Sequence, residues 1–165
     1  MAHTHKRHQY SVQVEWTGDR GTGTSAYGAY ARDHVLLTVG KPPILASSDV
    51  AFRGDPARYN PEELLVAALA SCHMLWYLHL CAEAGITVVG YSDGASGTME
   101  ETANGGGRFT GVELRPVVAV DGNADHALAL RLHERAHQLC YISASVNFPV
   151  TCQPAIRDGS GTSRI

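Results

Sequence analysis

The sequence lacks the closely spaced cysteine pairs of common metal and redox motifs. Its 165 residues include four cysteines and no C-x-x-C pair, so neither a zinc ribbon nor a thioredoxin-type motif is supported. It also lacks a basic surplus, since the formal net charge is -3, and nucleic acid is not an expected partner. Residues 1–8 are polar and have no apolar signal-peptide core. We therefore predict a cytoplasmic protein whose cysteines are catalytic, metal-binding or inert, not a disulfide framework.

The composition is that of an ordinary globular protein. Hydrophobic residues make up 44% of the chain and charged residues 18%. The length suffices for one domain with a real core and is short for two. No internal repeat or linker interrupts the pattern. We predict a flexible polar arm over residues 1–9, a single domain over residues 10–156 and a disordered tail over residues 157–165.

The clearest predicted element is a long apolar helix that begins after Asn60. Asn60 is a good N-cap, Pro61 suits the first helical position, and Glu63 completes a capping box. Gly85 is a typical left-handed terminator. The run Leu64–Ala82 is long enough to raise the question of a membrane span. It contains two histidines and has no flanking basic cluster, so we expect no span.

This helix also predicts an assembly. Its side chains are apolar on nearly every face, and a helix of that kind must be buried on every side. One small domain has difficulty covering such a helix by itself. We therefore predict an obligate homodimer with the helix in its interface.

Strand-like patterns flank the helix on both sides. Alternation and turn signals predict strands at residues 10–16, 25–31, 34–39, 86–91, 97–102, 108–120 and 148–152. Helical spacing predicts a second helix at His126–Leu139. The connection at residues 41–59 is long and rich in Pro, Ser and Gly, which suggests a functional loop. The order of elements predicts an α+β fold with mostly antiparallel sheet.

Two cysteines, Cys72 and Cys140, lie at positions that suggest a chemical role and not only a structural one. Cys72 interrupts the apolar helix, and Cys140 ends the second helix three residues after His137 and three before Ser143. A protonated His137 beside Cys140 would lower the pKa of that thiol. The alternative is that both cysteines are small hydrophobes packed in a core. Cys81 faces the opposite side of the helix from Cys72 and is assigned to packing.

Glu62 opens the long helix ten residues before Cys72. That separation is about 15 Å along a straight helix, so the two side chains cannot touch within it. A relay between them needs an intervening arginine, a break in the helix or the partner subunit. The alternative for Glu62 is a first-turn carboxylate stabilised by the helix dipole.

Residues 133–137 spell a literal H-E-x-x-H on the second helix. His133 and His137, four residues apart, could bind zinc while Glu134 acts as a base. A zinc hydrolase also needs a third ligand, and none is evident beyond the nearby Cys140. It is the least favoured alternative.

Two motifs resemble those of the OsmC/Ohr family of thiol-dependent hydroperoxide reductases. NPEEL at residues 60–64, followed by ASC at residues 70–72, resembles the family's N-P-E-[EQ]-L helix start, whose cysteine falls ten residues after the first Glu. AHQLCYIS at residues 136–143 is similar to the family's A-H-x-x-C-P-x-S, with Tyr141 in place of the proline. The resemblance covers roughly residues 10–156.

The resemblance implies a two-cysteine peroxidase that needs no cofactor and no metal. Cys72 would attack an organic hydroperoxide and become a sulfenic acid, and Cys140 would resolve it as a disulfide. An external dithiol, a lipoylated protein in Ohr-type relatives, would regenerate the enzyme. The resemblance also implies α+β subunits in an intertwined homodimer with two sites at the interface. An apolar lining drawn from Leu69, Trp76 and Phe148 would favour organic hydroperoxides over hydrogen peroxide.

The family also uses an arginine to polarise the thiolate and the peroxide, and its glutamate, here Glu62, holds that arginine. Arg53 is our first choice because it lies just upstream of the signature, although a gap-free match puts Ala51 at the usual position. Arg32 and Arg58 are the alternatives. A non-enzymatic reading is an OsmC-like dimer whose apolar pocket binds a small ligand.

Overall fold

The structure is a computed structural model that describes residues 6–159. The predictions for residues 1–5 and 160–165 lie outside the described residues. The chain divides into two compact units, an N-terminal unit (Met1–Leu64) and a C-terminal unit (Leu65–Ile165). Each unit is described by itself.

The N-terminal unit is built on a three-stranded antiparallel sheet. Its strands are β1 (Gln13–Trp16), β2 (His34–Leu37) and β3 (Ile44–Ala46), in the order β1-β2-β3. A short 3-10 helix, η1 (Val50–Phe52), follows. The strand predicted at residues 25–31 is wrong, because these residues form turns.

Close backbone contact explains the course of that loop. The Ala31 N–H donates to the Gly18 carbonyl at 2.8 Å, and the Trp16 indole N–H donates to the Ala31 carbonyl at 2.8 Å. A Cβ on Gly18 would lie 2.0 Å from the Ala31 oxygen, so only glycine allows this approach. The segment is held by these contacts and not by a strand ladder.

The C-terminal unit contains two three-stranded sheets. One sheet has the order β4-β7-β9, from β4 (Val88–Asp93), β7 (Pro116–Val120) and β9 (Ala155–Asp158). The other has the order β5-β6-β8, from β5 (Ser96–Glu101), β6 (Gly107–Leu114) and β8 (Val150–Cys152). The β6–β8 and β7–β9 pairs are parallel and the others antiparallel. The α+β class with mostly antiparallel sheet is confirmed.

Two details of these strands differ from the sequence analysis. The single strand predicted at residues 108–120 is two strands, β6 and β7, which pair in different sheets on either side of Arg115. Strand β9 continues through Arg157 and Asp158, which pair with Ala119 and Val120 of β7, although these residues were assigned to the terminal tail.

The long helix α1 (Pro61–Glu83) begins and ends as its sequence predicts. The Glu63 N–H donates to the Asn60 side-chain oxygen at 2.7 Å, and the Glu63 carboxylate accepts from the Asn60 N–H at 3.2 Å. These two bonds are the predicted capping box. Gly85 adopts φ 71°, and the Ile86 N–H closes the last turn on the Cys81 carbonyl. The second helix, α2 (His126–Leu139), also has its predicted bounds.

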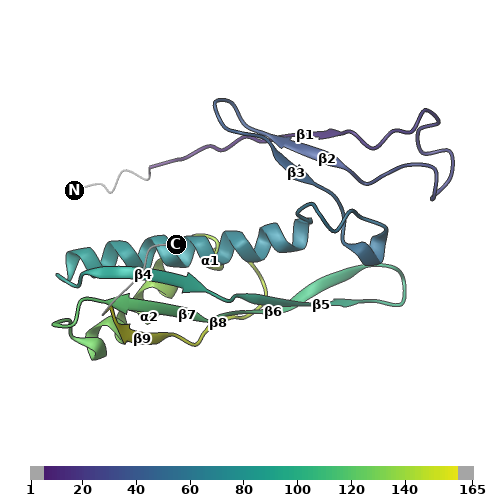
Figure 1. The fold of residues 1–165 in the computed structure, drawn as a ribbon. Helices are drawn as coiled ribbons and strands as arrows, with labels where there is room; N and C mark the ends of the chain where they lie inside the picture. The colour runs from purple at the N-terminus through teal and green to yellow at the C-terminus, as the bar shows by residue number, and fades with distance from the viewer. Residues whose placement is uncertain (1–5, 160–165) are drawn as a thin grey trace. The chain divides into compact units, whose positions relative to one another are not determined.

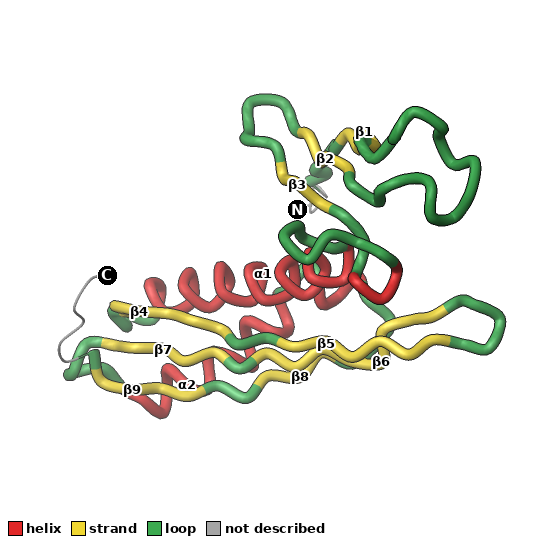
Figure 2. Tube along the Cα trace, turned by 45° about the vertical axis from the view of Figure 1, so that its right-hand side comes forward, coloured by secondary structure: helices red, strands yellow, loops and turns green. Residues whose placement is uncertain are grey.

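One stripe of α1 is fully buried in the C-terminal unit. Its members recur every four residues: Leu69, His73, Tyr77 and Cys81. Tyr77 and Cys81 share a core with Val118, Val120 and residues of α2, while Leu69 packs in a second core with Val112 and Leu114. Helix α1 runs along the strands of both sheets (Figure 1, Figure 2).

The remaining faces of α1 are only partly covered within one chain. Leu75 is 63% exposed, so a single chain does not bury this helix on every side. Among residues 6–159, α1 is the one helix long and apolar enough to cross a membrane, a test that core helices of soluble proteins also pass.

Candidate active site

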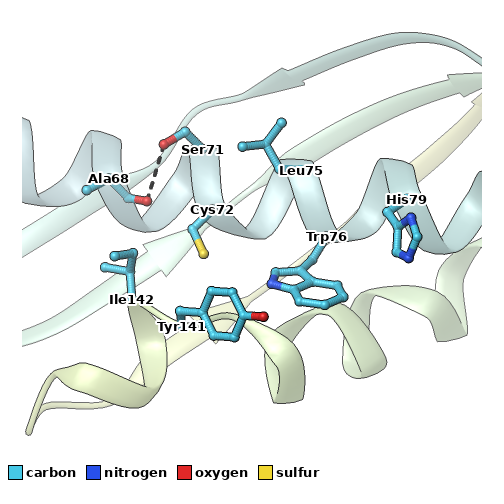
Figure 3. Close-up of a pocket in the computed structure, with 8 residues that line it drawn as sticks. All are labelled: Ala68, Ser71, Cys72, Leu75, Trp76, His79, Tyr141 and Ile142. Carbon is cyan, nitrogen blue, oxygen red and sulfur yellow. Dashed lines mark hydrogen bonds between the residues drawn. The ribbon is translucent and has the colours of Figure 1, made fainter. Parts of the chain in front are cut away.

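Cys72 opens into an apolar hollow on the surface of the C-terminal unit. The thiol is half-buried on α1 and points toward the segment that follows α2 (Figure 3). The hollow has a volume of about 530 Å³. Besides Cys72, its lining residues come from α1 and from the segment after Cys140: Ala68, Ser71, Leu75, Trp76, His79, Tyr141 and Ile142. A nonpolar molecule of modest size can therefore approach the sulfur.

Aromatic side chains form one wall of this hollow. Trp76 and Tyr141 meet edge to face with ring centroids 5.6 Å apart, a favourable arrangement for aromatic pairs. Tyr141, which replaces the family proline, is 70% exposed. Of the three predicted lining residues, Trp76 lines the hollow. Leu69 and Phe148 belong to the second core instead, so the prediction for these two is wrong.

Cys140 is the neighbouring thiol. It caps the C-terminus of α2 and is 2% exposed. The Ser143 N–H donates to its sulfur at 3.4 Å, and the Ala144 N–H donates to its carbonyl at 3.0 Å. These bonds fix Cys140 at the start of the 3-10 helix η2 (Ser143–Ser145).

Cys140 is a weakly acidic thiol that has Cys72 among its neighbours. Burial, with a smaller contribution from the adjacent Cys72 thiol, raises the pKa of Cys140 to about 11, although the hydrogen bond from Ser143 opposes this rise. The pKa of Cys140 is therefore raised and not lowered as expected from His137, because removal of the thiol from water is the largest effect on it. Both cysteines are free thiols in this structure.

The three candidate arginines all lie in the N-terminal unit, and two of them are engaged there. Arg58 pairs with Asp33 at 3.7 Å and with Asp55 at 3.5 Å. Arg32 donates to the carbonyls of Tyr27 and Tyr30 and lies over both rings. Both guanidinium groups thus have partners within the unit, although Arg58 Nη1 is buried without a hydrogen-bond partner among the described residues.

Arg53 is the least engaged of the three. Its side chain is exposed, with the guanidinium 5.6 Å from the Tyr27 ring centroid. None of the ion pairs found among residues 6–159 involves Arg53. Its backbone adopts φ 66° and ψ 30° after η1, an uncommon conformation for a residue with a Cβ. Outliers of this kind cluster at functional sites.

The two glutamates at the start of α1 have different surroundings. Glu63 is used by the capping box. Glu62 is half-buried in the first turn. Helix α1 is unbroken from Glu62 to Cys72, so the break that would have joined them directly is absent from this helix.

His73, His133 and Cys152 form a second group of polar side chains in the C-terminal unit. His73 follows Cys72 on α1, but its Nε2 contacts His133 Nδ1 of α2 at 3.0 Å and the Cys152 sulfur of β8 at 3.6 Å. His73 is fully buried and His133 is 2% exposed. The Tyr77 ring stacks on His133 with centroids 3.8 Å apart.

Burial keeps the side chains of His73, His133 and Cys152 neutral near pH 7. It lowers the pKa of His73 to about 4, with a smaller effect of His137, and the pKa of His133 to about 3, with a smaller effect of His73. It raises the pKa of Cys152 to about 12, and the nearby Asp93 carboxylate adds to this rise.

The sequence analysis missed this cluster. From the sequence, His73 is one of two histidines in an apolar run, and nothing singles out Cys152. The H-E-x-x-H pattern did single out His133. Within the described part of the chain, however, His133 gathers with His73 and Cys152, and not with His137 as that pattern predicted. A histidine in a fully apolar helix was the available signal, since buried polar groups need partners.

Comparisons with known proteins show the family and the fold of this chain. A family model described as OsmC-like protein matches residues 54–154. No curated protein matches the chain. The chain is similar to the solved structure of an OsmC-like protein of unknown function from Vibrio cholerae O1 biovar eltor str. N16961, with 31% identity and a TM-score of 0.80, covering 90% of this chain and 99% of that one.

Two more distant structures share the fold. An organic hydroperoxide resistance protein from Elizabethkingia anophelis, with thiocyanate bound, is 18% identical with a TM-score of 0.64, covering 93% of this chain and 100% of that one. A putative organic hydroperoxide resistance protein from Vibrio cholerae O1 biovar eltor str. N16961, with captopril bound in one of its active sites, is 20% identical with a TM-score of 0.64, covering 93% and 95% of the two chains.

Proposed function

Because this chain belongs to the OsmC-like protein family, we propose that it is a thiol-dependent peroxidase that reduces organic hydroperoxides in the cytoplasm. One observation carries the proposal: the half-buried Cys72 thiol opens into an apolar hollow, and the buried Cys140 thiol is its immediate neighbour. This arrangement supplies both sulfurs of a two-cysteine peroxidase and a surface for a nonpolar substrate.

The reaction begins at Cys72. Its thiolate attacks the distal oxygen of ROOH, the O–O bond breaks, and the products are the Cys72 sulfenic acid and RO⁻, which takes up a proton to leave as ROH. The Cys140 thiol then attacks the sulfenic sulfur, which forms the Cys72–Cys140 disulfide and releases water. An external dithiol reduces the disulfide by exchange and becomes a disulfide itself. Two electrons pass from the dithiol to each peroxide.

The hollow favours organic over inorganic peroxide. Leu75, Trp76 and Ile142 offer apolar surface around the sulfur, and burying an organic group against such surface contributes about 25 cal/mol per Å². Hydrogen peroxide has no group to bury there. The preference arises from binding the R group and not from the chemistry of the O–O bond.

Arg53 and Glu62 complete the proposed site. A thiolate needs a nearby cation to be stabilised, and Arg53 is the candidate whose guanidinium is least engaged by its own unit. In this proposal Arg53 stabilises the Cys72 thiolate and the departing RO⁻, while Glu62 orients the guanidinium through a hydrogen-bonded ion pair.

A second copy of the chain provides the cover for the site. Leu75 and Tyr141, at the rim of the hollow, are largely exposed in one chain, and exposed apolar surface beside a reactive group is typical of an interface. We place the hollow at the interface of a homodimer, as the family resemblance implies. Light scattering of the purified protein should give the mass of two chains.

A steady-state assay tests the function. Purified protein should turn over cumene hydroperoxide or tert-butyl hydroperoxide with dihydrolipoamide, and far more slowly with hydrogen peroxide. One equivalent of organic peroxide should remove two hydrogens from the intact mass, and peptide mapping should find a Cys72–Cys140 crosslink. In Cys140→Ser the sulfenic acid should persist and react with dimedone at Cys72. Absence of turnover together with absence of dimedone labelling would refute the proposal and favour a non-catalytic dimer that binds a small apolar ligand.

A further inference from the structure

The cluster of His73, His133 and Cys152 joins three elements that are distant in sequence. His73 lies on α1, His133 on α2 and Cys152 on β8. One donor atom from each, two imidazole nitrogens and a sulfur, lie within 4.8 Å of one another. Imidazole and thiolate are the protein ligands that zinc prefers.

Two of the three donor spacings are close to those of a tetrahedral metal centre. With Zn–N near 2.0–2.1 Å and Zn–S near 2.3 Å, two nitrogen ligands stand about 3.3 Å apart, and a nitrogen and a sulfur about 3.6 Å apart. The Cys152 sulfur is 3.6 Å from His73 Nε2, and the two nitrogens are 3.0 Å apart. In this structure the nitrogens share a hydrogen bond, which a metal would replace after a small outward shift.

Buried polar atoms without hydrogen-bond partners lie beside this cluster. Asp93 is a neighbour of Cys152. Its Oδ2 atom and the Tyr91 hydroxyl are buried and have no hydrogen-bond partner among the described residues. A divalent cation would compensate the charge of a Cys152 thiolate at this place. Buried charges are stable only when they are compensated in this way.

The cluster can also be reached from solvent. His133 and Cys152 line a cavity of about 610 Å³ together with Glu134, His137 and Gln138. This cavity shares no lining residue with the hollow at Cys72. An ion can therefore enter without passing the peroxide site, and a water molecule can occupy a fourth position on the cavity side.

We propose that His73, His133 and Cys152 form a binding site for one zinc-class divalent cation, with its fourth position open to the cavity beside α2. The site goes beyond the proposed peroxidase chemistry and does not depend on it. It also departs from the expectation of a metal-free protein. Bound metal would tie α1, α2 and β8 together and stabilise the C-terminal unit.

Cobalt substitution tests the site on the full chain. Reduced, chelator-treated protein is titrated with Co²⁺. We expect a near-ultraviolet thiolate-to-cobalt charge-transfer band and intense visible bands of tetrahedral cobalt that saturate at one ion per chain, and both should disappear when Zn²⁺ is added. The charge-transfer band is diagnostic because it requires sulfur, so the other histidines of the chain cannot produce it. No saturable band in the wild-type protein would overturn the proposal.

Matched variants assign the ligands. Cys152→Ser and His133→Gln should lose the charge-transfer band or weaken it at least about tenfold, as removal of a metal-site group does. Cys81→Ser, which alters another buried cysteine, should keep it, and so should the double variant Cys72→Ser/Cys140→Ser. A band that survives Cys152→Ser, or is lost in the double variant, would place the metal elsewhere and refute the proposal.

A thermal measurement guards against misfolded variants. At Zn²⁺ about a hundredfold above its dissociation constant, the Tm of the wild-type protein should rise by roughly 5–10 °C. Cys152→Ser should show a cooperative melt without this rise. An equal rise in both proteins would count against the site.

Discussion

Two neighbouring residues of α1, Cys72 and His73, lie in two different environments. The Cys72 thiol is half-exposed in an apolar hollow with Cys140 beside it, whereas the His73 imidazole is fully buried with His133 and Cys152. Successive residues of a helix are rotated by about 100°, so one step along the chain moves a side chain from one environment to the other. The hollow suits a molecule that enters and leaves, and the buried cluster suits an ion that stays.

The comparison also separates two uses of cysteine. Cys140 is buried and Cys152 is half-buried, and removal from water raises their pKa values to about 11 and about 12. Cys140 has another thiol as its neighbour, and Cys152 has an imidazole and a carboxylate. A sulfur neighbour allows a disulfide, while nitrogen and oxygen neighbours favour metal coordination. In the two proposals, the neighbours of each cysteine, and not the residue type, decide its chemistry.

The largest expected effect comes from removing the Cys72 thiol of the hollow while leaving the cluster of His73, His133 and Cys152 intact. Cys72→Ser should lower dithiol-dependent turnover of organic hydroperoxide by about a thousandfold or more, since it removes the nucleophile. It should leave cobalt binding unchanged. Cys81→Ala is the control and should keep normal turnover, because Cys81 belongs to neither region. Loss of cobalt binding in Cys72→Ser would show that the two regions act as one site.

The second largest effect is expected from removing the Arg53 guanidinium, which is proposed to stabilise the Cys72 thiolate. Arg53→Ala should lower kcat/KM by about a hundredfold, the cost of losing one charge-stabilising group. Arg53→Gly should show the same loss although glycine suits φ 66°, which separates the charge from the backbone conformation. Near-normal activity in Arg53→Gly would exclude the guanidinium from the mechanism.

Mixed dimers would show which chain supplies Arg53. Inactive Cys72→Ser and Arg53→Ala chains can be refolded together and assayed. Regained activity would mean that the arginine comes from the second copy, because such a dimer then carries one complete site. Activity that is not regained would mean that each chain completes its own site.

A pH series should separate the two thiols of the hollow. Below its pKa of about 11, the thiolate fraction of Cys140 rises about tenfold for each pH unit, and alkylation of Cys140 by iodoacetamide should accelerate by that factor between pH 7 and pH 10. Cys72, which is more exposed, should be alkylated first at pH 7. Peptide mapping by mass spectrometry measures both rates. Equal labelling of both cysteines at pH 7 would contradict the burial of Cys140.

The smallest effect distinguishes the two adjacent glutamates. Glu63→Gln weakens the charged half of the capping box and should lower the free energy of unfolding by about 0.5–1 kcal/mol, with normal turnover. Glu62→Gln should instead lower turnover and change the unfolding free energy by less. Urea denaturation and the peroxide assay together test the pair. A reversed pattern would assign the arginine-holding role to Glu63.

Local signals in the sequence predicted the helices well. The Asn60–Glu63 capping box, Gly85 and the bounds of α2 all depend on interactions within a few residues, and the structure confirms them. The family motifs likewise placed Cys72 and Cys140, whose proximity the structure supports.

Features that depend on distant residues were not predicted. The His73–His133 contact joins residues 60 apart in sequence, and the His73–Cys152 contact joins residues 79 apart. No spacing rule connects such residues before the fold is known. The change of sheet at Arg115 depends in the same way on the parallel partners β8 and β9, which come more than thirty residues later. Apolar periodicity identifies a strand but not its partner.

The edge-to-face contact between Trp76 and Tyr141 should allow oxidation of the cysteines to be followed by the fluorescence of Trp76. Tyr141 directly follows Cys140, so in the proposed reaction the backbone movement that forms the Cys72–Cys140 disulfide should also shift the phenol ring against the indole. Indole emission responds to such changes in its immediate surroundings, and oxidation by substrate should therefore appear as a stopped-flow fluorescence transient that Trp76→Phe abolishes.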